Sequence, residues 1–233
     1  EYLSAGLSEE FDVAAAENGQ EAVEMMKKRL PDIILSDVMM PVMDGVKLCR
    51  TVKQNIETSH IPVIMLSAKS DIKWQMEGLG AGADDYIPKP FSLAIVTGKI
   101  RNMMRTRLSA IRHFAESAEV APEKIALNKL DEEFLKKAVA AVEAHLDDCA
   151  FSADMFAEAM NMSRSNLHIK MKALTGSSSM DFIRKIRLSK ACELLKDGRY
   201  SVAEVSDMVG YSSPAYFTTS FKKHFGCLPS EYK

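Results

Sequence analysis

The stretch DIILSDVMMPVMDG, residues 32–45, places an aspartate directly after a short and largely apolar run. The run at 32–36 is rich in isoleucine and leucine and does not alternate with polar residues. Such runs are typical of strands that are buried on both faces of a parallel sheet. In open α/β sheets, ligands bind at the carboxyl ends of the strands. Asp37 is therefore the first candidate functional residue.

Helix and strand patterns alternate on both sides of this stretch. Further strands are predicted at 61–66 and 83–87, each a compact apolar segment. Strands that alternate with helices at this spacing indicate a parallel, doubly wound sheet. The predicted helices are 18–30, 45–55, 70–80 and 92–107.

Three polar side chains stand at the ends of three successive predicted strands: Asp37, Ser67 and Lys89. Taken one at a time, the aspartate fits a helix cap or turn, and the lysine fits a solvated surface. Together they bring a carboxylate, a hydroxyl and an ammonium to one edge of the sheet. This set suits a phosphoryl group, with the aspartate as nucleophile and the other two as ligands of the phosphate oxygens.

Three motifs in order, SDVMMPVMDG at 36–45, LSA at 66–68 and DDYIPKPF at 84–91, resemble the receiver domain of bacterial response regulators. The resemblance covers residues 1–107 and implies a flavodoxin-like, doubly wound parallel sheet. It also implies four roles and a cis peptide before Pro90, which X–Pro bonds allow at low cost. The implied roles are phosphoacceptor for Asp37, switch hydroxyl for Ser67, phosphate-binding lysine for Lys89 and reorienting aromatic for Tyr86.

The resemblance further implies a Mg²⁺ ion held by Asp37 and by the backbone carbonyl of Met39. Receiver domains begin with a strand that ends in two acidic residues, and these complete the metal site. This chain opens at Glu1, already in the first helix. We therefore expect the first strand, central in the sheet order 2-1-3-4-5, and the remaining acidic ligands to lie upstream. Glu9 and Glu10 do not replace that pair, because they lie at the far end of the helix.

From about residue 130 the strand pattern disappears and only helices are predicted. Residues 108–129, which contain Pro122 and few large apolar side chains, are predicted to be a linker to an all-α domain at 130–233. Serines precede several of these helices and glycines follow them, as expected for helix caps. The predicted helices are 130–146, 152–160, 163–175, 180–196, 202–209 and 213–225.

Two helix-turn-helix units are predicted in this domain, at 152–175 and 202–225, joined by the long helix 180–196. A single unit is weak evidence, because a structural three-helix bundle gives the same pattern. Two units, together with the closing segment VAEVSDMVGYSSPAYFTTSFKKHFGCLPSEY at 202–232, resemble the AraC/XylS-type DNA-binding domain. The resemblance implies that each second helix lies in a major groove of double-stranded DNA, with the two grooves roughly 34 Å apart.

The outward faces of these two reading helices supply the candidate DNA contacts. Leu167, Met171 and Leu174 mark the core face of the first helix. The core face of the second helix is marked by Phe221, Phe225 and either Tyr216 or Phe217. The first helix offers polar readers of bases, whereas the second offers mainly methyl groups and hydroxyls. Lysines late in the second helix, and Arg187 on the joining helix, are expected to contact phosphates. The candidates are Arg164, Ser165, His168, Ile169, Lys172, Arg187, Ala215, Thr218, Thr219, Lys222 and Lys223.

Composition and charge limit the classes of protein to which this chain can belong. The 233 residues are 47% hydrophobic and 27% charged, as in ordinary globular proteins, and no apolar run is long enough to span a membrane. The four cysteines are far apart and form no zinc or disulfide pattern. Residues 160–233 hold 12 basic and 6 acidic side chains, whereas 1–159 hold 18 and 26. A basic C-terminal segment on an otherwise acidic chain is typical of a module that binds a polyanion.

These features predict a phosphorylation-controlled, DNA-binding transcription regulator rather than an enzyme. Its expected partners are double-stranded DNA, a histidine kinase, and a second copy in a homodimer that forms on phosphorylation. The segment at 134–148, FLKKAVAAVEAHLDD, is similar to the cytoplasmic tail of hybrid two-component sensors. That similarity implies a cytoplasmic segment without membrane contact of its own, with the kinase on a separate polypeptide or upstream on the same one. Two alternatives remain: a phosphoaspartate-dependent phosphatase or phosphotransferase, and an interaction module that is never phosphorylated.

Overall fold

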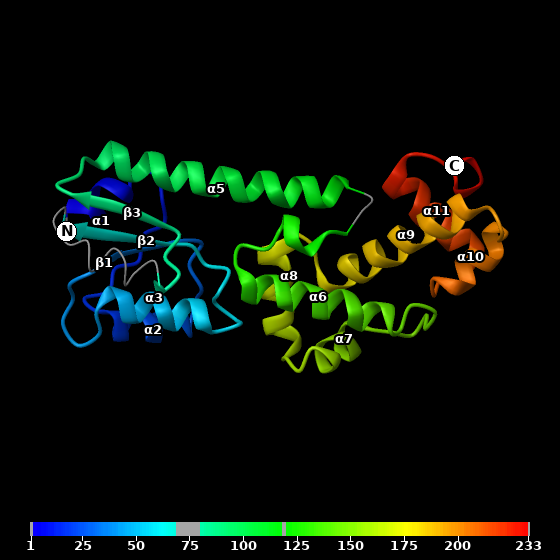
Figure 1. The fold of residues 1–233 in the computed structure, drawn as a ribbon, viewed down its shortest axis with the longest axis horizontal. Coiled ribbons are helices and arrows are strands. Elements are labelled where there is room, and N and C mark those ends of the chain that lie inside the picture. The colour runs from blue at the N-terminus through cyan, green and yellow to red at the C-terminus, as the bar shows by residue number, and fades with distance from the viewer. Residues whose placement is uncertain (1, 69–79, 118–119, 233) are drawn as a thin grey trace. The chain divides into compact units, whose positions relative to one another are not determined.

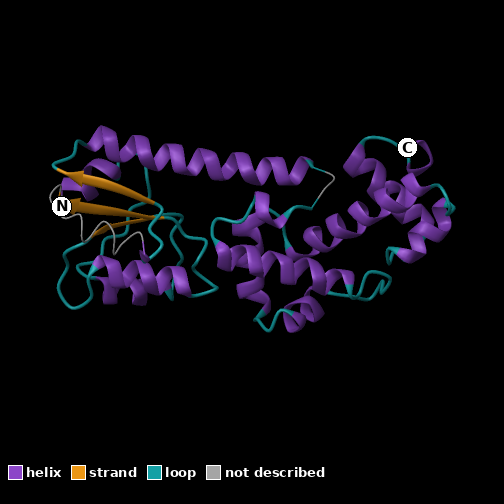
Figure 2. Cartoon of the chain, viewed as in Figure 1, coloured by secondary structure: helices purple, strands orange, loops and turns teal. Residues whose placement is uncertain are grey.

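A computed structural model describes residues 2–68, 80–117 and 120–232 of the chain (Figures 1 and 2). The chain divides into two compact units, Glu1–Leu108 and Ser109–Lys233. Residues 70–79 of the predicted helix at 70–80 lie outside the described residues. Within the described ranges, no helix has the length and apolar character that a membrane span requires.

The first unit is an α/β fold built on a parallel sheet of three described strands, in the order β1–β2–β3. The strands are Ile34–Asp37, Val63–Ala68 and Asp85–Lys89. Helices cover both faces, which makes the fold doubly wound as predicted (Figure 1). Helices α2 (Gly19–Met26) and α3 (Gly45–Gln54) pack on one face, and α1 (Tyr2–Leu7) and α5 (Leu93–Glu116) pack on the other.

Each strand begins two residues later than the sequence predicts. Pro62 has no amide hydrogen to donate to a ladder, so β2 begins at Val63. The carbonyl of Pro62 instead accepts a hydrogen bond from the amide of Ile34 at 2.8 Å, which aligns β1 with β2. Asp37 is consequently the last residue of β1 rather than the residue after it.

The second unit is helical, as predicted (Figure 2). The serines predicted as N-caps all have this role, because the side chain of each accepts a hydrogen bond from a backbone amide in the first turn. They are Ser152, Ser163, Ser201 and Ser213. The helices are α6 (Lys129–Glu143), α7 (Ala153–Ala159), α8 (Arg164–Thr175), α9 (Ser179–Asp197), α10 (Val202–Met208) and α11 (Pro214–Phe225), with 3₁₀ turns at Pro122–Lys124 and Pro229–Glu231.

The segment at 108–129 has regular structure and contributes to a core. Helix α5 continues to Glu116, so the predicted helix end at residue 107 is wrong. Burial explains the longer helix: Phe114 is 2% exposed and stacks on Phe182 of α9 at a centroid distance of 6.3 Å. Ile125 joins the same cluster. The division into a receiver at 1–107, a linker at 108–129 and a DNA-binding domain at 130–233 stays a prediction.

Helix α9 contributes to two separate hydrophobic cores of the second unit. Ile183 and Ile186 pack with residues of α6, α7 and α8, whereas Leu188 and Ala191 pack with residues of α10 and α11. Each helix-turn-helix unit therefore has its own core, and α9 is the element that joins them.

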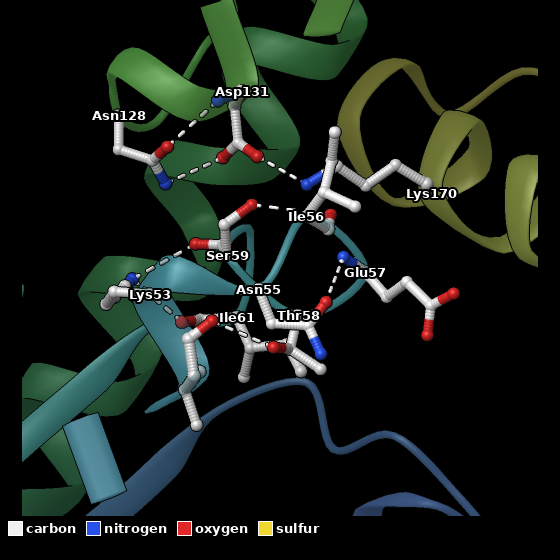
Figure 3. A network of polar contacts seen from close by, with 11 residues as sticks. Lys53, Asn55, Ile56, Glu57, Thr58, Ser59, Ile61, Asn128, Asp131 and Lys170 are labelled. Carbon is white, nitrogen blue, oxygen red and sulfur yellow. Dashed lines mark hydrogen bonds and ion pairs between the residues drawn. The ribbon is translucent and has the colours of Figure 1, made fainter. Parts of the chain in front are cut away.

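A buried ion pair ties α6 to α8 (Figure 3). The Nζ atom of Lys170 lies 2.5 Å from Oδ1 of Asp131, and the two side chains are 1% and 0% exposed. Asn128, the N-cap of α6, donates to the other carboxylate oxygen at 2.8 Å. Lys170 follows Leu167 by three residues and so lies on the core side of α8, a position that the sequence does not predict for a lysine.

Candidate phosphoryl site and nucleic-acid interface

Asp37 and Lys89 form an ion pair at the carboxyl end of the sheet. Asp37 lies opposite Leu66 of β2, and Lys89 lies opposite Ala68 one strand further on. Their side chains are 36% and 41% exposed, so solvent and a phosphoryl donor can reach the carboxylate. The peptide bond between Lys89 and Pro90 is cis, as the resemblance to receiver domains implies.

Met39 lies close to the second carboxylate oxygen of Asp37. Its amide donates to Oδ1 of Asp37 at 3.2 Å, which places this part of the backbone beside the carboxylate. Mg²⁺ prefers oxygen ligands and usually keeps several waters alongside one or two carboxylates. The carboxylate of Asp37 and the Met39 peptide group fit part of such a site. No group of three or more acidic, histidine or cysteine side chains that could hold a metal occurs in the described ranges.

Glu10 serves a structural contact away from this site. Its carboxylate accepts two hydrogen bonds from the guanidinium of Arg101, at 2.7 and 2.5 Å. These hydrogen bonds lower the pKa of Glu10. The contact gives Glu10 a cationic partner on α5.

Gly45 allows α3 to begin close to the phosphoacceptor strand. A Cβ atom at this position would lie 2.0 Å from the carbonyl oxygen of Asp37 and 2.8 Å from Oγ of Ser36. The amide of Gly45 also donates to the carbonyl of Val38 at 3.0 Å. Any larger residue would therefore displace the backbone that carries the candidate nucleophile.

The hydroxyls of Ser67 and Tyr86 are buried, and neither has a hydrogen-bond partner among the described residues. Burial, with a smaller contribution from Cys49, raises the pKa of Tyr86 to about 12, so the phenol stays neutral. An unsatisfied buried polar group costs about 1–3 kcal/mol. Both hydroxyls would therefore gain from a new hydrogen-bond partner, and within the described part of the chain no hydrogen bond connects either of them to Asp37.

The outward face of α8 is exposed, as the sequence predicts. Leu167, Met171 and Leu174 are at most 2% exposed and form the core face. Arg164 makes an ion pair with Asp154 of α7 at 3.0 Å; exposed pairs of this kind are weak, so the guanidinium can exchange its partner. The exposed candidates on this face are Arg164, Ser165, His168, Ile169 and Lys172.

Helix α11 presents few free donors on its outer face. The hydroxyls of Thr218 and Thr219 donate to carbonyls one turn earlier, at 2.8 and 3.0 Å, which leaves their methyl groups and oxygen lone pairs. The sequence leaves Tyr216 and Phe217 undecided as core residues, and Phe217 takes the core while Tyr216 is 52% exposed. Tyr216 is thus a missed member of this face. The other candidates are at least partly exposed: Ala215, Thr218, Thr219, Lys222 and Lys223.

Arg187 is buried, and the prediction that it is exposed on the joining helix for a phosphate contact is wrong. Its side chain is 8% exposed, and its guanidinium donates to the carbonyls of Gly210 at 3.0 Å and Asp148 at 2.5 Å. Burial lowers the pKa of Arg187 from its ordinary value. The position on α9 faces the protein because the loops on either side fold over it.

Two families match the two parts of the chain. Residues 2–101 match the family described as response regulator receiver domain, and residues 156–233 match the family described as helix-turn-helix domain. The chain therefore combines a receiver domain of the response regulator family with a helix-turn-helix domain of the AraC type.

Individual relatives resemble one or both parts. "Histidine kinase P4" of Formosa agariphila is 37% identical over 227 residues, which are 97% of this chain and 17% of that protein. "Transcriptional regulatory protein CseB" of Streptomyces avermitilis is 45% identical over 95 residues, 41% of this chain and 39% of that protein. The receiver domain of a signal transduction histidine kinase from Syntrophus aciditrophicus has 36% identity and a TM-score of 0.43, over 45% of this chain and 80% of that one. The chain spans less than half the length of these two curated relatives.

Proposed function

We propose that this chain is the phosphorylation-controlled, DNA-binding part of a transcription regulator. The observation that carries the proposal is the pair Asp37–Lys89 at the end of the parallel sheet, on a chain whose other unit presents two exposed reading helices. The exposed carboxylate is the proposed acceptor of the phosphoryl group, and the exposed helices are the proposed readers of double-stranded DNA.

In the proposed transfer, an oxygen of Asp37 attacks phosphorus, and the bond between phosphorus and the donor breaks. The ammonium of Lys89 stabilises the added negative charge. The carboxylate of Asp37 and the carbonyl of Met39 would hold part of a Mg²⁺ site, and the bound ion would supply neutralisation of the charge on the transferring group. The hydroxyl of Ser67, which has no hydrogen-bond partner among the described residues, can then move and donate to a phosphoryl oxygen. Tyr86 reorients into the space that the serine side chain leaves.

The phosphoryl donor is proposed to be a histidine kinase, on a separate polypeptide or on the same one. The 37% identity to a protein named a histidine kinase, over nearly the whole chain, supports the second arrangement. A cytoplasmic location follows from a partner that is genomic DNA. A regulator of this kind accepts a phosphoryl group on itself and does not process other substrates. Incubation with small phosphoesters should therefore give no catalytic turnover. Steady turnover would favour the phosphatase alternative.

Phosphorylation of Asp37 is expected to shift the complete protein from monomer towards homodimer through the receiver. The movement of Ser67 and Tyr86 changes the surface next to β3, and a switch requires that the two states differ in their affinity for a partner. Sedimentation analysis with and without a phosphoryl mimic measures the shift. An unchanged monomer fraction over a wide concentration range would count against dimerisation.

Replacing Arg164 or His168 by alanine is expected to cost about 1–3 kcal/mol of binding to a specific duplex, with relaxed sequence preference, because both lie on the exposed face of α8. Lys222→Ala and Lys223→Ala serve as matched controls on α11. They should weaken all duplexes about equally and flatten the salt dependence, since phosphate contacts release counterions. Binding to specific and scrambled duplexes at several salt concentrations separates the two effects. Equal loss on both duplexes for the α8 variants would remove that helix as the principal reader.

A further inference from the structure

We propose that Arg187 is a positioning residue for DNA recognition, which holds the second helix-turn-helix unit in a fixed place relative to the first. The proposal rests on the proposed DNA-binding function. In this proposal, the buried side chain of Arg187 keeps α8 and α11 at a fixed distance and orientation, so that both helices can bind the same DNA duplex in register.

The contacts of Arg187 reach both halves of the second unit. Its Nη2 atom donates to the carbonyl of Asp148, in the loop between α6 and α7 of the first half, at 2.5 Å. Its Nη1 atom donates to the carbonyl of Gly210, in the turn between α10 and α11 of the second half, at 3.0 Å. Arg187 itself lies on α9, between Ile186 in one core and Leu188 in the other. One guanidinium thus connects three segments.

Gly210 shows how closely these segments approach. Its φ angle is +68°, and a Cβ atom would lie 2.4 Å from the carbonyl oxygen of Leu146 and 3.0 Å from Nη2 of Arg187. Only glycine tolerates both this backbone conformation and the lack of space. The turn before α11 therefore lies in close contact with the loop before α7, and the guanidinium of Arg187 is hydrogen-bonded to both.

The chemistry of the contact requires an arginine. The guanidinium is a planar fork with several donors in fixed directions, so it can span two carbonyls at once. A lysine at this position would carry the same charge on a single atom and could not hold both carbonyls in the same geometry. A methionine would keep much of the packing and remove both hydrogen bonds.

The predicted consequence concerns half-site spacing in the DNA. Inserting one base pair between two half-sites moves one relative to the other by about 3.4 Å and rotates it by about 35°. A rigid pair of reading helices cannot follow this change, whereas a pair joined only by α9 can adjust to it.

The test uses the whole chain and a duplex that the unaltered chain selects from a random-sequence library. We expect the unaltered chain to lose at least about tenfold in affinity when one base pair is inserted between the half-sites. Arg187→Met should bind the selected duplex about tenfold more weakly, and its ratio between the two spacings should fall towards one, with affinity for a single half-site unchanged. Lys190→Met is the matched control, because it removes a charge from α9 without touching either carbonyl; it should keep the spacing ratio.

A spacing ratio in Arg187→Met equal to that of the unaltered chain would overturn the proposal, whatever happens to its overall affinity. If Arg187→Met does not fold, Arg187→Lys decides in the same assay. Spin labels on unnatural amino acids at positions 165 and 219 give a second readout without DNA: the distance distribution should be narrow in the unaltered chain and broad in the Arg187 variants. Equally narrow distributions would contradict the proposal, whereas failure of the unaltered chain to bind any duplex would overturn the proposed function instead.

Discussion

Replacing Asp37 by asparagine is expected to abolish phosphoryl labelling of the complete protein by a small donor such as acetyl phosphate in the presence of Mg²⁺. An amide oxygen is a poor nucleophile, and the substitution leaves the shape of the site almost unchanged. The structure presents the Asp37 carboxylate at an exposed strand end and beside Lys89, which is the arrangement that a phosphoryl acceptor needs. Labelling is measured by incorporation of radioactive phosphate into the folded protein.

Asp44→Asn is the matched control for this experiment. Asp44 lies at the end of the loop that follows Asp37, but its side chain caps α3 by accepting from the amide of Lys47 at 2.7 Å, and asparagine caps a helix equally well. Labelling should therefore persist in Asp44→Asn. Persistent labelling of Asp37→Asn on another carboxylate would refute the assignment of Asp37.

Replacing Asp131 by alanine is expected to destabilise the second unit by about 3–5 kcal/mol. Removing one partner of a buried ion pair leaves the other charge in the core without its counterion, and Lys170 is only 1% exposed. A loss of this size is a large share of the roughly 5–15 kcal/mol that stabilises a typical domain. Hydrogen exchange of the α8 amides measures the free energy of opening for this unit separately from the receiver.

Glu132→Ala on the same helix is the matched control. Glu132 pairs with Lys136 at 2.5 Å, but this pair is solvent-exposed, so its loss should leave the exchange of α8 nearly unchanged. Equal effects of Asp131→Ala and Glu132→Ala would show that burial of the Asp131–Lys170 pair has no special role. Replacing both buried partners by apolar residues should restore much of the lost stability, because no unpaired charge then remains.

The parts of the fold that follow from local patterns could be predicted from the sequence. Helix α8 is an example: Ser163 caps it, and Leu167, Met171 and Leu174 face its core at helical spacing. The limits of the strands were harder to predict. Pro62 affects them through the hydrogen bonds between β1 and β2, and that pairing is not visible in the local sequence.

Contacts between distant segments could not be predicted. Helical periodicity places Arg187 away from the apolar side of α9. It does not reveal that the loop at Asp148 and the turn at Gly210 cover the arginine side chain. The burial of Lys170 could not be predicted for the same reason, because the carboxylate that pairs with it comes from Asp131 on α6, far away in the sequence. At the phosphoryl site the three motifs name Asp37 and Lys89, and the structure adds that they form an ion pair while Ser67 has no described partner.

The central claim is that phosphorylation of Asp37 controls DNA binding, and affinity for a selected duplex tests it most directly. The measurement compares the complete protein in its phosphorylated and unphosphorylated forms with the Asp37→Asn variant, at one salt concentration. Coupling between two linked sites typically amounts to about 1–3 kcal/mol, so the Kd of the phosphorylated form should be lower by about 5- to 150-fold, and the variant should not respond to the donor. The same Kd for all three would contradict the claim.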